Sequence, residues 1–295
     1  MPRAIIFGIS GQDGFYLEKL LQQNGTAVKG VSRSEGQWLQ GDVGNRAFTE
    51  GIIKSEKPEY IFHLAANSKT DHELIFEHQS TIVDGTLNIL EAVSKYSACS
   101  KIFITGSGLQ FENKGNPISE QTPFLARDVY SLARIQSVYI ARYYRSKGFN
   151  VYAGYLFHHD SPYRTTRHLN RRIADAALAA GRGEDYPLTI GDVTVEKEFG
   201  FAGDIAKGIF HLIQQEELFE ACIGTGKAYP IEKWLELCFT SVGKNWKDYV
   251  QPDNNYTPDF KKLVSDPSAI KKTGWSSKTG IETLAEMMLQ SSPEQ

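Results

Sequence analysis

The residue pair best suited to chemistry is Tyr130 and Arg134, four positions apart in a segment with a helical pattern. On a helix this spacing places both side chains on one face. A nearby cation favours the phenolate form of a tyrosine, which can then exchange a proton with a hydroxyl whose carbon gives up hydride. Because this spacing is common in ordinary helices, the prediction rests on where the pair lies in the chain. The helix follows a buried strand at residues 101–105 and can line a redox site.

A glycine-rich turn near the N-terminus indicates which redox group could stand beside this pair. An apolar strand at residues 4–7 is followed by Gly8, Gly11 and Gly14 and then by an amphipathic stretch. The first glycine allows a tight turn, the second lets a pyrophosphate approach the backbone, and the third lets the helix pack on the sheet. The phosphates would bind the free N–H groups of that helix. We therefore predict a dinucleotide-binding turn; glycines used for packing alone are the alternative.

The residues after the second predicted strand, 26–31, bear on the type of dinucleotide. An acidic residue there would hold the ribose hydroxyls of NAD, whereas an arginine can hold the 2′-phosphate of NADP. The chain has Arg33 at this point, so NADP is favoured over NAD, with a solvated loop arginine as the alternative. Asp42, in a third predicted strand at 38–43, could cap the next helix or reach the adenine amino group.

Strands and helices alternate from residue 4 to residue 157. Further buried strands are predicted at 59–66 and 151–157, with a helix at 45–55 and another that carries Ile82, Leu87, Leu90 and Val93 on one face. Such alternation specifies a parallel sheet covered by helices on both faces, and ligands bind at the carboxyl ends of its strands. The residues expected at those ends are Gly8, Arg33, Asp42, Ala65 and Thr105.

The rhythm changes after residue 157. An arginine-rich stretch with a helix at about 167–180 is followed by a strand-and-helix unit at 198–215 and a last sheet strand at 221–224. We predict an α/β fold: a Rossmann-type, doubly wound parallel sheet from residues 1–157 plus about 198–224, which binds NAD(P). A smaller α/β cap, from about 158–197 and 225–295, would bind the substrate. Residues 291–295 look like a disordered tail.

The composition excludes several classes of function. The net charge of −3 and the absence of a basic patch argue against a nucleic-acid partner. No apolar run approaches the roughly 20 residues of a membrane helix, and the first strand begins too early for a signal peptide. Cys99, Cys222 and Cys238 show no paired spacing, which suggests reduced thiols in a cytoplasmic protein. No metal site is predicted.

Several motifs resemble the extended short-chain dehydrogenase/reductases and, within them, the GDP-mannose 4,6-dehydratases, over nearly the whole chain. The most specific is Gly8-Ile9-Ser10-Gly11-Gln12-Asp13-Gly14, because Gln-Asp inside the glycine motif is distinctive of that family. Residues 156–162 resemble its Leu-Phe-Asn-His-Glu-Ser-Pro. The other matching segments are Gly41-Asp42-Val43, His63-Leu64-Ala65-Ala66, Val83-Asp84-Gly85-Thr86, Arg171-Arg172-Ile173 and residues 266–275.

The resemblance implies an enzyme that acts on a nucleotide-diphosphate sugar. By this resemblance, Tyr130 occupies the position of the family's catalytic tyrosine. Arg134 would be its electrostatic partner and would bind the ribose of the nicotinamide. His158, Arg172 and Lys197 stand where the family contacts the substrate diphosphate; a solvated basic face is the alternative for the last two. The family pairs through the tyrosine helices, so a homodimer or homotetramer is expected. The implied cofactor contacts are Gly8, Gly11, Gln12, Asp13, Gly14, Arg33, Asp42, Val43, Leu64, Ala65, Ala66, Tyr130, Arg134 and Phe157.

The chain departs from this family at catalytic positions. The dehydratases carry Ser-Thr-Ser-Glu after the fifth strand, where this chain has Thr105-Gly106-Ser107-Gly108. In the dehydratases this Thr assists proton transfer and this Glu moves protons during elimination, but in this chain both positions are glycine. Ser107 or Thr105 could still supply a hydroxyl. Arg134 replaces the usual lysine and cannot exchange a proton. Thr257 replaces an arginine expected to hold the diphosphate, for which Lys261 or Lys262 could compensate.

These changes favour hydride transfer at the sugar C4, as in a 4-ketoreductase or 4-dehydrogenase, over dehydration. A true 4,6-dehydratase or an epimerase that uses another proton shuttle, such as Glu112 or Asp128, is one alternative. A regulatory protein that binds NADP(H) without turnover is another. Binding of a nucleotide sugar separates the enzymes from the regulator.

Overall fold

A parallel sheet of seven strands forms the centre of the computed structural model, which describes residues 1–253 and 255–290. The predicted tail at 291–295 lies outside the described residues. The strands run in the order β3-β2-β1-β4-β5-β6-β11, and each pair of neighbours is parallel. Their bounds are β1 Arg3–Phe7, β2 Ala27–Ser32, β3 Leu39–Gln40, β4 Tyr60–His63, β5 Lys101–Ser107, β6 Asn150–Leu156 and β11 Glu220–Ile223.

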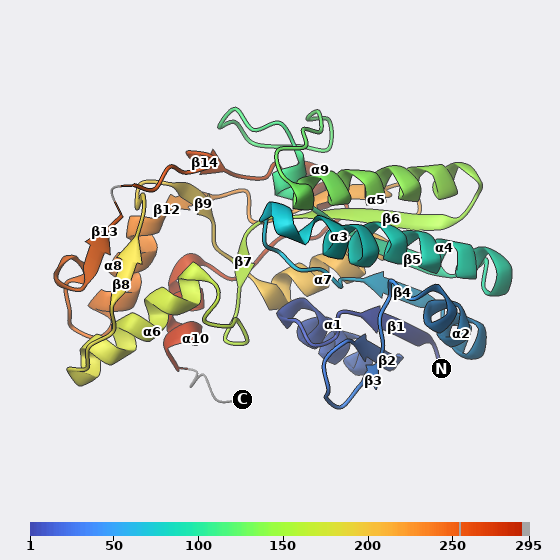
Figure 1. The fold of residues 1–295 in the computed structure, drawn as a ribbon, viewed down its shortest axis with the longest axis horizontal. Coiled ribbons are helices and arrows are strands. Elements are labelled where there is room, and N and C mark those ends of the chain that lie inside the picture. The colour runs from blue at the N-terminus through green and yellow to red at the C-terminus, as the bar shows by residue number, and fades with distance from the viewer. Residues whose placement is uncertain (254, 291–295) are drawn as a thin grey trace.

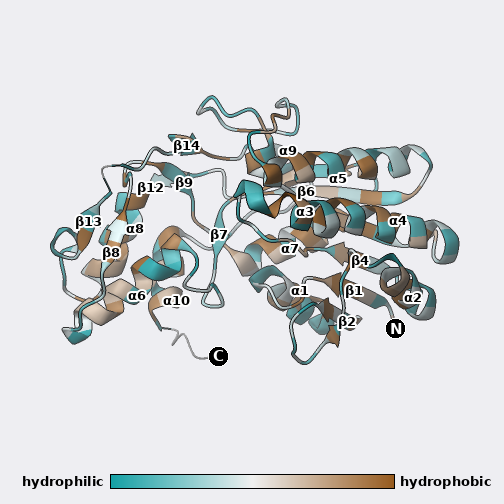
Figure 2. Cartoon of the chain, in the orientation of Figure 1, coloured by the Kyte–Doolittle hydropathy of each residue, from teal (hydrophilic) through white to brown (hydrophobic). Residues whose placement is uncertain are grey.

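Helices cover both faces of this sheet (Figure 1). Successive residues of a strand point to opposite faces. Ile6 packs with residues of α1 and α7, whereas Ile5 packs with residues of α2, α4 and α5. Helices α4 and α5 show apolar and polar colours along their length, as expected of helices with one buried face (Figure 2). The bounds are α1 Gln12–Gln23, α2 Arg46–Glu56, α3 Ile75–His78, α4 Gly85–Tyr96, α5 Val129–Ser146, α7 Ala202–Ile213 and α9 Ser268–Lys272.

The predicted Rossmann-type α/β fold is therefore confirmed, including the last sheet strand near residue 221, which pairs with β6. Two details differ from the prediction. The third strand is only Leu39–Gln40, because the chain leaves the sheet edge directly after it. Leu87 is 42% exposed rather than buried with Leu90 and Val93. A π-helical stretch, Gln79–Asp84, precedes α4 and breaks the 3.6-residue phase that would have aligned Ile82 with Leu87.

A second group of elements lies on the other side of the molecule from β1 and β2 (Figure 1). Helices α6, α8 and α10 pack around Ile173, Trp234 and Leu284, apart from the cores beside the large sheet. This separate core supports the predicted substrate cap, whose boundaries stay a prediction. The bounds are α6 Leu169–Arg182, α8 Ile231–Thr240, α10 Ile281–Gln290, β7 His159–Asp160, β8 Leu188–Ile190, β9 Glu196–Glu198, β10 Gly200–Phe201, β12 Ala228–Pro230, β13 Val250–Pro252 and β14 Lys262–Leu263.

Candidate active site

The glycine turn has the geometry of a phosphate cradle. Gly8 has a φ of 96°, and a Cβ there would lie 2.6 Å from the Ala65 nitrogen, so only glycine fits. A Cβ at Gly14 would lie 2.6 Å from the Gly8 oxygen, which confirms that this glycine lets α1 pack closely. At Gly11 the nearest heavy atom would be 3.5 Å away. The protein itself thus leaves room at residue 11, and no side chain caps the N-terminus of α1 there.

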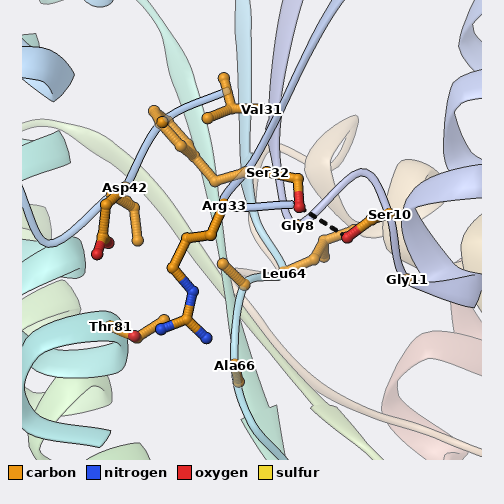
Figure 3. Close-up of a pocket in the computed structure, with 14 residues that line it drawn as sticks. Gly8, Ser10, Gly11, Val31, Ser32, Arg33, Asp42, Leu64, Ala66 and Thr81 are labelled. Carbon is orange, nitrogen blue, oxygen red and sulfur yellow. Dashed lines mark hydrogen bonds between the residues drawn. The ribbon is translucent and has the colours of Figure 1, made fainter. Parts of the chain in front are cut away.

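A cavity of about 200 Å³ opens beside this turn at the carboxyl ends of β1, β2, β3 and β4 (Figure 3). It brings together most of the residues predicted to hold the adenosine half of a dinucleotide. Asp42 does not cap α2, because Asn45 does so and accepts a bond from the Phe48 N–H at 3.1 Å. The lining residues are Phe7, Gly8, Ser10, Gly11, Val31, Ser32, Arg33, Gly41, Asp42, Val43, Leu64, Ala65, Ala66 and Thr81.

A larger cavity of about 380 Å³ adjoins the first, shares Gly8 and Gly11 with it, and extends to the tyrosine helix α5. Every predicted catalytic residue lines it, as does Phe157. His159, Arg164 and His168 line it too, although no role is predicted for them from the sequence. The full lining is Gly8, Gly11, Gln12, Asp13, Gly14, Leu64, Ala66, Ser68, Thr105, Gly106, Ser107, Gly108, Leu109, Tyr130, Arg134, Leu156, Phe157, His158, His159, Arg164, His168 and Leu263.

Tyr130 and Arg134 meet on one face of α5, as their spacing predicts. The guanidinium carbon lies 5.1 Å from the centre of the Tyr130 ring, over its face. Nη1 of Arg134 donates to the Thr105 carbonyl at 2.6 Å, and Nε is buried with no hydrogen-bond partner among the described residues. The cation is thus held beside the ring, and the bond to Thr105 uses one of its five N–H donors.

The two predicted hydroxyl groups are partly engaged by the protein. Thr105 Oγ1 donates to the His63 carbonyl at 2.8 Å, and Ser107 Oγ accepts from the Leu109 N–H at 3.2 Å. Ser107 therefore keeps its proton for a ligand, whereas the Thr105 proton is already used. Of the two, Ser107 is better placed to donate into the cavity.

The positions of the missing Thr and Glu have no free space for a side chain. A Cβ at Gly106 would lie 2.6 Å from the Tyr155 ring and 2.9 Å from Oε1 of Gln110. A Cβ at Gly108 would lie 2.8 Å from Cε1 of Phe157. The neighbouring side chains have therefore filled the volume that the family's catalytic groups need.

Gln12 and Asp13, the distinctive pair of the glycine motif, bind the chain after β6. The Gln12 amide donates to the His159 carbonyl at 3.2 Å, and its Oε1 accepts from Ser161 Oγ at 2.9 Å. The Asp13 carboxylate pairs with Nε2 of His159 at 2.8 Å. Burial lowers the pKa of His159, but the charge and hydrogen bond of Asp13 outweigh it and raise this pKa. The pair thus joins the start of α1 to β7.

The predicted diphosphate ligands are not all in one place. His158 lines the larger cavity. Its burial, and to a lesser extent the positive charge of Lys197, lower its pKa to about 3, so the imidazole is neutral at physiological pH. A neutral imidazole can still donate one hydrogen bond to a phosphate. Lys197 is buried near Asp160 and Arg164, and neither it nor Arg172 lines either cavity. Arg164, which bonds Asp160 at 3.0 Å, presents the cation instead.

The groups proposed to compensate for the family's missing residues are occupied elsewhere. Lys261 and Lys262 pair with Asp192 and Glu196 at 2.7 and 2.8 Å. Glu112 pairs with Lys114 at 3.0 Å, and Asp128 caps α5 by accepting from the Ser131 N–H at 2.7 Å. None of these four acidic or basic candidates from the sequence lines the larger cavity.

Neither a metal-ligand cluster nor a membrane-spanning helix occurs in the described ranges, 1–253 and 255–290. Within them, no three or more His, Cys, Asp or Glu side chains gather as they would around a metal ion. No helix in those ranges is long and apolar enough to cross a membrane.

The sheet order, the glycine turn and the tyrosine helix beside it define an extended short-chain dehydrogenase/reductase. Within this class, the family model described as GDP-mannose 4,6 dehydratase matches residues 5–288, so the chain belongs to that family.

Curated relatives and solved structures agree with this assignment. GDP-mannose 4,6 dehydratase 1 of Arabidopsis thaliana is 28% identical over 97% of this chain and 88% of its own length. The Homo sapiens GDP-mannose 4,6 dehydratase is 27% identical over 82% and 72%. A UDP-glucose 4-epimerase of Thermotoga maritima, solved with UDP-glucose, covers 98% of this chain and 97% of its own with a TM-score of 0.87 at 19% identity. RMD from Pseudomonas aeruginosa, solved with NADPH, reaches 0.84 at 18%, with 98% of each chain covered. At these identities the structures show the shared fold.

Proposed function

We propose that the two cavities hold a nicotinamide adenine dinucleotide, with NADP preferred and NAD possible. The observation that supports this is the position of the glycine cradle. It lies at the N-terminus of α1, which no side chain caps, and it adjoins both the cavity lined by Arg33 and the cavity lined by Tyr130. Asp42, Val43 and residues 64–66 would hold the adenosine half. Structural neighbours solved with NAD or NADPH support a cofactor of this class.

We infer that the reaction is hydride transfer at C4 of the sugar in a nucleotide-diphosphate sugar, without loss of water. One observation carries this choice: the larger cavity presents Tyr130 and Arg134, while its single lining carboxylate, Asp13, is bound to His159. When bound, the nicotinamide would supply or accept the hydride. Tyr130 would move the proton on O4, Arg134 would stabilise the phenolate, and the Ser107 hydroxyl would orient the substrate oxygen.

Elimination of water across C5 and C6 makes a further demand on the protein. It requires a group that takes the C5 proton and returns a proton to the departing hydroxyl. Gly106 and Gly108 cannot supply one, and Glu112 and Asp128 are held by Lys114 and Ser131. Dehydration remains the second candidate, because the family model is that of the dehydratases.

The cap supports an anionic substrate. Arg164, His158 and His168 line the larger cavity, and a diphosphate would satisfy their donors. The contributions of Arg172 and Lys197 stay predictions. We therefore propose the substrate as a class, the nucleotide-diphosphate sugars.

The proposal is tested by presenting GDP-, UDP-, dTDP- and CDP-sugars to the protein in thermal-shift titrations with NADPH present. At least one nucleotide sugar should raise the unfolding temperature beyond the effect of NADPH alone. With the matching 4-keto sugar, NADPH absorbance should then fall. Binding of NADPH with no response to any nucleotide sugar would instead favour the regulatory alternative.

A further inference from the structure

Arg33, the predicted ligand of the 2′-phosphate, already has an anionic partner. From the end of β2 it extends across the smaller cavity towards Thr81, as Figure 3 shows. Its Nη2 bonds Oε1 of Glu77 at 2.8 Å, and Glu77 lies on α3. Oε2 of the same carboxylate accepts from the Asn67 amide at 3.4 Å. Glu77 therefore holds the guanidinium from helix α3.

The rest of the cavity offers little to distinguish a ribose hydroxyl from a phosphate. Of the residues that line it, two are charged, Arg33 and Asp42, and Asp42 already accepts from the Gly44 N–H at 2.8 Å. Ser10, Ser32 and Ser34 form a chain of hydroxyls 2.8 and 3.1 Å apart. Hydroxyls can bond a ribose or a phosphate, so discrimination by charge falls to Arg33 and its partner.

The Arg33–Glu77 pair is of the kind that a ligand can open. The two side chains are 52% and 28% exposed, and exposed pairs of this kind are weak. The hydrogen bond from Arg33 lowers the pKa of Glu77, so the carboxylate is ionised at neutral pH. A phosphate that takes Nη2 of Arg33 must displace this carboxylate. A cofactor with a free 2′-hydroxyl leaves the pair intact.

We propose that Glu77 is a specificity-determining residue that competes with the 2′-phosphate of NADP for Arg33. This competition reduces the preference for NADP over NAD that Arg33 creates, so that the protein can also bind NAD. The inference rests on the proposed dinucleotide function, and it adds a residue outside the glycine and strand-end motifs.

The test is the substitution Glu77→Gln, which keeps the shape of the side chain and removes its charge. Dissociation constants for NADPH and NADH are measured by calorimetry at fixed ionic strength. The variant should bind NADPH about five- to tenfold more tightly, on the scale of one favourable charge contact, and NADH within about twofold of wild type. Glu73→Gln, at an exposed position one turn earlier, makes the same change in net charge and should alter neither constant.

The double variant Arg33→Ala/Glu77→Gln isolates the competition. If Glu77 acts through Arg33, its replacement should no longer tighten NADPH binding in the Arg33→Ala background. A gain that persists there, or a Glu77→Gln variant that matches Glu73→Gln, would overturn the inference. Wild-type protein that binds neither dinucleotide would overturn the proposed function itself, whereas dinucleotide binding that is indifferent to Glu77 would overturn only this inference.

Discussion

Tyr130 is the residue on which the proposed chemistry depends. Its ring packs against Ile82, Val83 and Ala133 and lies under the Arg134 guanidinium, so a phenylalanine would keep every one of these contacts. Only the proton-carrying hydroxyl would be lost. Tyr130→Phe should therefore retain NADPH binding and lose about 10²–10⁴-fold in turnover, the usual contribution of a general acid–base group.

The measurement is steady-state hydride transfer with the nucleotide sugar identified by the binding panel. Tyr139→Phe is the matched control, because Tyr139 is on the same helix and is 57% exposed. Turnover in Tyr130→Phe that matches the control would assign the proton transfer to another group.

Gly108 provides a test of whether the missing carboxylate can simply be restored. A side chain there would push against the Phe157 ring, and overpacking a dense core costs about 1–3 kcal/mol. Gly108→Glu should therefore lower the free energy of unfolding by that amount and yield no 6-deoxy product. Gly51→Glu is the control, because Gly51 lies on helix α2 and a Cβ there would meet no atom within 4 Å.

Denaturant unfolding and product analysis by NMR check both parts. A Gly108→Glu variant as stable as Gly51→Glu that also forms a 4-keto-6-deoxy sugar would contradict the steric account.

The sequence predicted which residues line the cavities where a motif fixes their position, and their roles stay predictions. Gly8 and Ala65 follow buried strands and Asp42 follows the short edge strand β3, so their meeting at the carboxyl ends of the strands could be foreseen. His159, Arg164 and His168 could not, because contacts from Gln12 and Asp13 set the path of their segment. Adjacent histidines in a segment already matched to the family were the available signal. The glycines at 106 and 108 showed from the sequence alone that the family's Thr and Glu are missing. That the side chains of Tyr155 and Phe157 fill the space beside these glycines could not be predicted.

At the scale of elements, the buried Asp13–His159 pair joins α1 to β7. The raised folded-state pKa of His159 means that its stabilisation is present below the ordinary value of 6.5 and is lost as pH rises through the folded-state pKa. Burial raises the pKa of Asp13, but His159 outweighs this and lowers it below 3.8. The contribution of Asp13 is therefore lost as pH falls through its folded-state pKa. The ion pair should stabilise most in mildly acidic solution.

His159→Gln should accordingly destabilise the protein by about 3 kcal/mol near pH 6, as expected when one partner of a buried pair is removed. The deficit relative to wild type should be smaller at pH 9 than near pH 6, because the wild-type imidazole loses its charge as pH rises through its raised folded-state pKa. Unfolding free energies at the two pH values check this, with exposed His72→Gln as control. A deficit that is the same at both pH values would show that the charge of His159 contributes nothing.

The elements themselves were predictable because buried parallel strands read as short apolar runs between amphipathic helices. The exposure of Leu87 was not, because a π-helical stretch leaves no clear mark on apolar spacing. The cap was predicted only in outline. Its short strands, such as β8 and β13, pair with segments far away in the sequence.

At the scale of the whole molecule, α5 presents Leu132, Tyr139 and Tyr143 on one exposed face, and α4 presents Leu87. Exposed apolar groups aligned along neighbouring helices mark an interaction surface. We expect the chain to form a homodimer through these helices. Leu132→Glu should shift the mass measured by light scattering from dimer to monomer, whereas Leu125→Glu, which precedes α5, should not. A wild-type monomer at micromolar concentration would contradict the expectation.

The central claim is that the molecule transfers hydride at the sugar C4 without eliminating water. It is tested most directly by incubation with the cofactor and GDP-mannose or related nucleotide sugars in D₂O, with the products followed by NMR. We predict hydride exchange or C4 redox products, little 6-deoxy sugar and no deuterium at C5, because the one carboxylate that lines the larger cavity, that of Asp13, is bound to His159. Rapid formation of a 4-keto-6-deoxy sugar would contradict it and would place the proton shuttle on another residue.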